Sequence, residues 1–179
     1  DNAERRVNAI YCLTHLSGDS VLPLLAALES GNDRVERNAC ACLGTIGDRR
    51  ALPGLKREFE ASDNEVNKAA ANDAIMRISG RDAGALAAAD ELHVAAATSY
   101  FRNDQSIAAP YDTQNAVWKW EGTGVEAQKV PAVLRNLRLA EQHCMAALGS
   151  ANAQKVLFAS YAGEKAALAS AKEMGAEGE

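Results

Sequence analysis

Aromatic residues are scarce in this chain, at 5% of its 179 residues. Strand-type sequence is confined to one short stretch, so a β-sandwich or barrel has too little β-forming material. The hydrophobic share is an ordinary 47%, but much of it is alanine. Small residues at this density suit closely packed helices. The composition therefore predicts a largely helical protein, of a size that forms one sizeable domain or two small ones.

Acidic and basic residues are interspersed along the chain, and no run of lysine or arginine occurs. The formal net charge is −5. A stripe of cations for nucleic-acid phosphates is missing, which speaks against nucleic-acid binding. No stretch of about eighteen apolar residues occurs, so no membrane-inserted helix is expected. No signal peptide is visible, and the chain starts at Asp1 without a methionine. We expect a fragment or a processed product, and the sequence indicates neither a compartment nor an oligomeric state.

Metal-binding and disulfide patterns are also missing from the cysteines, which are Cys12, Cys40, Cys42 and Cys144. Residues two apart in a helix point in different directions, so Cys40 and Cys42 should not form a bridge. No further ligands occur at helical spacing beside them. We therefore expect the four thiols to be reduced, small apolar residues of the core.

A segment does recur about every thirty residues in the first half of the chain. Equivalent places are held by three alanines, two prolines and three glycines: Ala9, Ala39, Ala70, Pro23, Pro53, Gly18, Gly47 and Gly80. A repeat of this length is typical of stacked helix pairs, each of which buries its apolar side on the next.

Hydrophobic spacing places helices in this region near 4–16, 21–30, 34–46, 52–59 and 65–78. Two of them have inward-facing sets that we expect to be buried: Val7, Ile10, Leu13 and Leu16 in the first, and Val66, Ala70, Ala74 and Ile78 in the last. Asp33 can cap the third helix with Glu36 completing a capping box, and Asp48 can cap the fourth.

The segment from Arg34 to Asp48, followed by Ala51-Leu52-Pro53-Gly54-Leu55, resembles the HEAT repeat. It is most similar to the short bacterial kind, the phycobilin-lyase-type HEAT-like repeats, in which Glu36 stands where an arginine is usual. The resemblance implies an all-α fold, an α-solenoid of about two and a half units over residues 1–82. It also implies that the second helix of each unit lines an inner, concave side.

Residues 83–179 read as a helical region that contains a β-hairpin. The pattern predicts helices over 83–102, 131–148, 152–162 and 164–174, a loop over 103–114 and a frayed tail after Gly175. Alternating residues on either side of Gly122-Thr123-Gly124 predict the hairpin, near 115–130. Residues 131–162 are similar to a tetratricopeptide helix pair, and the whole combination is similar to modular bacterial scaffold proteins.

Catalytic and cofactor-binding motifs are missing. The histidines His15, His93 and His143 lie far apart in the sequence, and none belongs to the His-Glu pairs with which some HEAT-repeat hydroxylases bind iron. No nucleophile motif occurs. The sequence therefore predicts no enzyme, no metal and no cofactor. We expect His15 to interact with the C-terminal end of its helix.

Two groups of residues remain as candidates for binding a protein or peptide. Trp118 and Trp120 lie two apart on a strand and share one face, which either anchors the hairpin on a helix or forms an aromatic binding surface. The HEAT resemblance places polar residues of the second helices on the inner side, where a partner would bind: Arg37, Asn38, Lys68 and Asn72.

The most favoured function is non-catalytic protein–protein interaction or scaffolding within a larger bacterial protein. One alternative is a subunit similar to the bilin lyases, which handle a tetrapyrrole and its carrier protein. A second is a DNA-binding HEAT protein similar to the alkylpurine glycosylases, although that class needs a basic concave face and the charges here are mixed.

Overall fold

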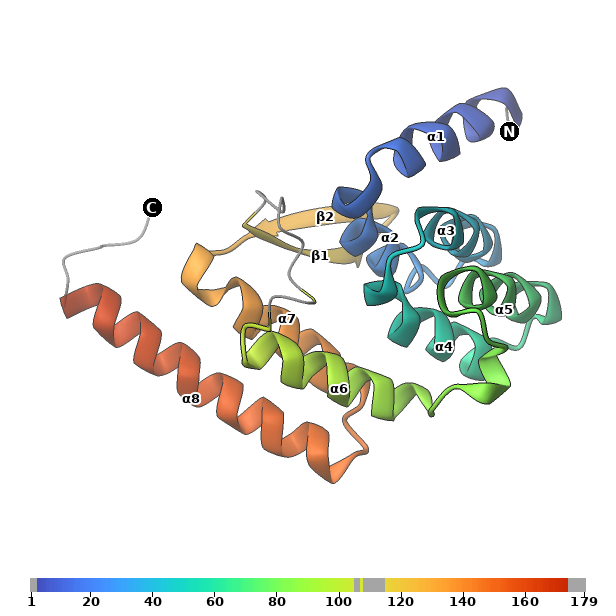
Figure 1. Ribbon diagram of the computed structural model, residues 1–179. Coiled ribbons are helices and arrows are strands. Elements are labelled where there is room, and N and C mark those ends of the chain that lie inside the picture. The colour runs from blue at the N-terminus through green and yellow to red at the C-terminus, as the bar shows by residue number, and fades with distance from the viewer. Residues whose placement is uncertain (1–2, 105–106, 108–114, 174–179) are drawn as a thin grey trace. The chain divides into compact units, whose positions relative to one another are not determined.

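The computed structural model describes residues 3–104, 107 and 115–173 of the chain (Figure 1). The chain divides into two compact units, and each unit consists of two separate segments of the sequence. The first unit comprises residues 1–89 with the hairpin segment 118–127, and the second comprises residues 90–117 and 128–179. The predicted boundary at residue 82 lies a few residues before the end of the first segment.

The first unit is built of helical hairpins that stack side by side. Its elements are α1 (Ala3–His15), η1 (Ser17–Ser20), α2 (Val21–Ala27), α3 (Asp33–Ile46), η2 (Arg49–Ala51), α4 (Leu52–Ala61), α5 (Glu65–Ser79) and η3 (Ala83–Ala85). α2 pairs with α3 and α4 with α5, while α3 also contacts both α1 and α5. The predicted α-solenoid architecture of this region is therefore confirmed.

Local sequence accounts for where these helices begin and end. The side chains of Asn32 and Asn64 accept hydrogen bonds from the first amides of α3 and α5, so each is the N-cap. The N-cap of α3 thus lies one residue before the predicted Asp33. Gly47 and Gly80 follow the two helices with φ of +77° and +71°, a left-handed conformation that glycine adopts without steric cost.

The core of the first unit consists of small and medium apolar side chains. Its largest fully buried members are Leu43, Leu55 and Ile75. α3 and α5 approach closely because α3 carries a glycine at the crossing, where a Cβ on Gly44 would lie 2.8 Å from the Cα of Ala74. Close helix packing of this kind is what the alanine-rich composition predicts.

Buried polar side chains join successive repeats. Arg50 is buried, pairs with Asp48 at 2.7 Å, and donates to the carbonyl of Gly18 in the preceding repeat at 3.0 Å. The ammonium of Lys56 donates to the carbonyl of Ala83 at 2.8 Å. These contacts satisfy charges that burial would otherwise make costly.

Helix α1 has more solvent-exposed side chains than the spacing of its hydrophobic residues predicts. Ile10 and Leu13 pack against the core, but Val7 and Leu16 are about 60% exposed, and Cys12 is exposed as well. The expectation that these three residues are buried is wrong, because α1 packs on α3 with Ile10 and Leu13 and leaves these three side chains facing solvent. Val66, at 56% exposed, also points outward from α5 rather than inward.

The second unit is largely helical and includes parts of the two-stranded hairpin. The remaining elements of the chain are α6 (Ala89–Phe101), β1 (Ala116–Glu121), β2 (Gly124–Lys129), α7 (Ala132–Ala146) and α8 (Ala151–Glu173), of which the hairpin residues 118–127 belong to the first unit. The predicted hairpin is confirmed. The helix predicted over 83–102 begins only at Ala89, after the 3-10 turn η3. The two helices predicted over 152–174 form the single helix α8.

Packing within the second unit involves mainly α7 and α8. Arg138 on α7 lies 2.9 Å from Glu141 on the same helix and 2.9 Å from Glu164 on α8. Most of the predicted loop 103–114 and the tail after Gly175 lie outside the described residues. Among the helices in the described part of the chain, none is both long and apolar enough to cross a membrane.

Candidate functional site

The solvent-facing side of α1, α3 and α5, which we call the ridge, carries the four polar candidates. Arg37 and Asn38 are half-buried on α3, and Lys68 and Asn72 are half-buried on α5. Because α3 packs against α5 with the repeat in register, these side chains occupy related positions on neighbouring helices. The structure therefore brings the four residues onto one pair of packed helices.

Their local contacts differ. Lys68 pairs with Glu65 at 2.9 Å on the same helix, a pair that is exposed and contributes little to stability. The side-chain carbonyl of Asn72 accepts a hydrogen bond from the backbone N–H of Ala83 at 2.8 Å. Asn72 therefore holds the turn after α5, whatever else it binds. Within the described residues, no ion pair involves Arg37.

Sequence reasoning missed the apolar part of the ridge. Val7 and Tyr11 are each 61% exposed on α1. They precede Arg37 and Ala41 by about thirty residues, which is the length of the repeat, so they hold the equivalent helical positions. The repeat register indicates that Val7 is a surface residue, because it aligns with Arg37. The hydrophobic pattern of α1 alone groups Val7 with the residues that are expected to be buried.

The two tryptophans lie on β1 with Lys119 exposed between them, as the alternation predicts. Both are half-buried, and Trp120 packs against the core of the first unit together with Val125 of β2. Trp120 thus anchors the hairpin. A role for either tryptophan in binding a partner stays a prediction.

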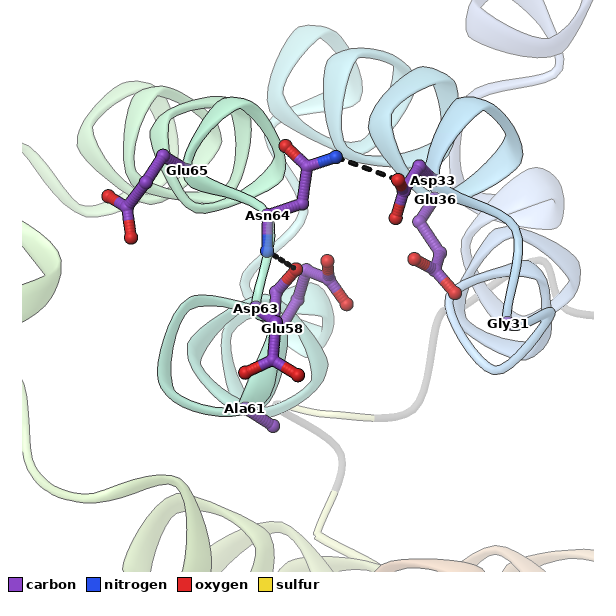
Figure 2. A pocket seen from close by; sticks show the side chains of 9 residues that line it. Gly31, Asp33, Glu36, Glu58, Ala61, Asp63, Asn64 and Glu65 are labelled. Carbon is purple, nitrogen blue, oxygen red and sulfur yellow. Dashed lines mark hydrogen bonds between the residues drawn. The ribbon is translucent and has the colours of Figure 1, made fainter.

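An open depression lies where α3 and α5 begin and α4 ends (Figure 2). It is lined by Gly31, Asp33, Glu36, Glu58, Ala61, Ser62, Asp63, Asn64 and Glu65. Five of these residues are acidic and none is basic. The amide of Asn64 donates to Asp33 at 2.7 Å across the depression, which links the starts of the two helices.

The floor of this depression holds two carboxyl groups that influence each other. Burial raises the pKa of Glu58, and the negative charge of Glu36 raises that pKa further, while hydrogen bonds with Ser62 and Asn67 oppose the rise. Asn67 is fully buried and donates to Glu36 at 3.2 Å. The same two glutamates, after the larger effect of burial, help to raise the pKa of the Cys40 thiol to about 12. Cys40 is therefore a protonated, unreactive core residue.

The three histidines are placed differently from one another. His15 lies at the end of α1, as predicted, and its Nδ1 atom is 2.8 Å from the carbonyl oxygen of Tyr11. His93 on α6 and His143 on α7 face each other, with their Nδ1 atoms 2.9 Å apart, and Tyr100 stacks on His143. In the described part of the chain, no group of three or more metal-binding side chains is arranged to hold an ion.

These observations define the class of protein to which the first unit belongs, which is an α-solenoid of stacked helical hairpins. A family model of HEAT repeats matches residues 1–76. Residues 1–76 therefore match the HEAT-repeat family, whose repeats generally mediate protein–protein interaction. No curated protein and no solved structure matches the chain.

Proposed function

We propose that the chain is a non-catalytic module for protein–protein interaction or scaffolding, and that the ridge binds its partner. The observation that carries this proposal is the exposure of large apolar side chains on the ridge. Val7 and Tyr11 on α1 and Val66 on α5 are all more than half exposed. Val7 and Tyr11 are neighbours one turn apart on α1, and adjacent exposed apolar groups rimmed by polar ones are typical of surfaces that bind other proteins.

The neighbouring polar residues fit the same role. Arg37 and Asn38 lie on α3, between α1 and α5, and so lie between the apolar groups. Arginine is enriched at protein interfaces because its guanidinium combines a planar apolar surface with five hydrogen-bond donors. The combination supports an extended binding surface rather than one deep pocket.

Affinity capture with the intact chain tests the proposal. The bait would be compared with a variant that carries Arg37→Ser, Asn38→Ser and Lys68→Ser, which leaves Asn72 in place because of its contact with Ala83. We expect the variant to lose specific captured proteins while its helical circular-dichroism signal and melting temperature stay unchanged.

A matched control would carry serine at three exposed residues outside the ridge: Glu29, Arg49 and Arg81. The control variant should capture the same proteins as the unmodified chain. Equal capture by all three baits would show that the ridge does not bind the partner.

A further inference from the structure

The chemistry of the ridge indicates what kind of partner it fits. On α3, Arg37 is half-buried, and no ion pair within the described residues involves it. Lys68, by contrast, already has Glu65 as its partner. Arg37 is therefore a cation of the ridge that is available to bind a carboxylate from another molecule.

The apolar groups lie on the two helices that flank this arginine. With 3.6 residues per turn and the repeat in register, Val7 and Arg37 hold the same level on adjacent helices, as do Tyr11 and Ala41. On α5 the position that corresponds to Arg37 is Lys68, and Val66 lies two residues before it. Packed helices lie about 8–10 Å apart. One segment of a few residues can therefore reach Val7, Tyr11 and Arg37.

We infer that the ridge binds an acidic, partly apolar segment of a partner protein, with a carboxylate on Arg37 and apolar side chains on Val7 and Tyr11. This inference rests on the proposed function and adds the chemistry of the partner. A guanidinium binds a carboxylate through two parallel hydrogen bonds, and the pair is strengthened where flanking apolar side chains exclude water. The exposed apolar groups add apolar surface that is buried on binding, and this burial stabilises the complex beyond what a single ion pair contributes.

A basic partner fits a different part of the molecule. The depression at the starts of α3 and α5 presents five acidic residues, among them Asp33 and Asp63, so basic peptides would point to that depression rather than to the ridge. The two surfaces thus attract segments of opposite charge. A selection of peptides can decide between them without knowledge of the natural partner.

Random twelve-residue peptides displayed on phage would be selected on the immobilised intact chain, and the recovered peptides measured by fluorescence anisotropy. We expect recovered peptides to carry Asp or Glu between apolar or aromatic residues. Arg37→Glu and Tyr11→Ser should each weaken their binding by roughly tenfold or more. Arg49→Glu, the same charge change at an exposed site outside the ridge, should change it less than twofold.

A second selection, on the Arg37→Glu variant, should recover peptides in which Lys or Arg replaces the acidic residue. Peptides that depend on Tyr11 but carry no acidic residue would overturn the inferred chemistry and leave the ridge as the binding surface. Basic peptides that depend on Asp33 and Asp63, peptides insensitive to every ridge substitution, or no enrichment at all would overturn the inference and the proposed function together.

Discussion

Arg50 connects two repeats through one side chain. Its guanidinium pairs with Asp48 and donates to the carbonyl of Gly18, and its exposed fraction is only 8%. Burying a cation costs free energy unless hydrogen bonds and a counter-charge replace its water, and these contacts do so. Its neighbour Arg49 is exposed and offers a natural comparison.

Replacing Arg50 by methionine should therefore lower the free energy of unfolding by about 2–4 kcal/mol, because Asp48 loses its partner and the Gly18 carbonyl its donor. Arg49→Met should change it by less than about 0.5 kcal/mol. Urea unfolding followed by circular dichroism measures both. Similar values for the two variants would contradict a structural role for Arg50.

Glu58 predicts a dependence of stability on pH. Its pKa is raised in the folded protein, first by burial and then by the charge of Glu36. The folded state then holds the proton more tightly than the unfolded state, so this group makes the protein less stable as pH rises from the ordinary value of 4.5 to the folded pKa. Below that window the group is protonated in both states, and its contribution is constant.

Glu58→Gln removes this titration. We expect the variant to gain stability relative to the unmodified protein as pH rises from about 4 to 7, with no further change in the difference below about 4. Unfolding curves recorded across that range measure the difference. Glu29→Gln, at an exposed site, should give a difference that is flat with pH. A flat difference for Glu58→Gln as well would show that burial does not perturb this carboxyl.

At the scale of the helices, the repeat is held together by the close contact of α3 and α5. Gly44 sits at the crossing, where an added Cβ would lie 2.8 Å from the Cα and 3.0 Å from the Cβ of Ala74. The obstacle is helix backbone, which cannot rotate away. At Gly54 on α4, the nearest atom is instead the flexible end of the Leu25 side chain.

Gly44→Ala should destabilise the first unit by about 1–3 kcal/mol, although alanine is the better helix former by about 1 kcal/mol. Gly54→Ala should cost clearly less, because Leu25 can change rotamer. Thermal unfolding of the two variants gives the comparison. A stabilised Gly44→Ala protein would mean that α3 and α5 lie farther apart than described.

At the scale of the whole molecule, residues distant in sequence complete the HEAT part of the chain. Residues 118–127 belong to the first unit, and Trp120 and Val125 pack against its core. The hairpin is therefore a structural part of the stacked helices, even though thirty or more residues separate it from η3 and α5 in the chain.

Trp120→Ala should consequently destabilise the first unit by about 1–3 kcal/mol, less than a fully buried tryptophan would. Hydrogen exchange of amides in α3, α4 and α5 should accelerate in this variant. Lys119→Ala, one residue away and exposed, should leave the exchange unchanged. Acceleration limited to the hairpin itself would show that its contact with the helices is not stabilising.

The sequence alone determined the features that are local or periodic. Asparagine or aspartate before a helix and glycine after it act within a few residues, so the hairpins and the turns at Gly47 and Gly80 could be read directly. The repeat length gave the stacking for the same reason, because each unit can cover its apolar side only on the next. The β-hairpin followed from alternation around its glycines.

Only the tertiary structure decided which surfaces are covered. Val7 and Leu16 read as buried but are exposed, and Asn72 reads as a free ridge residue but holds the backbone of Ala83. The pairing of His93 with His143 and the contact of Trp120 with the HEAT core also join distant segments. A periodic pattern says which side of a helix is apolar. Whether another element lies against that side depends on contacts between residues far apart in the chain, which no local pattern encodes.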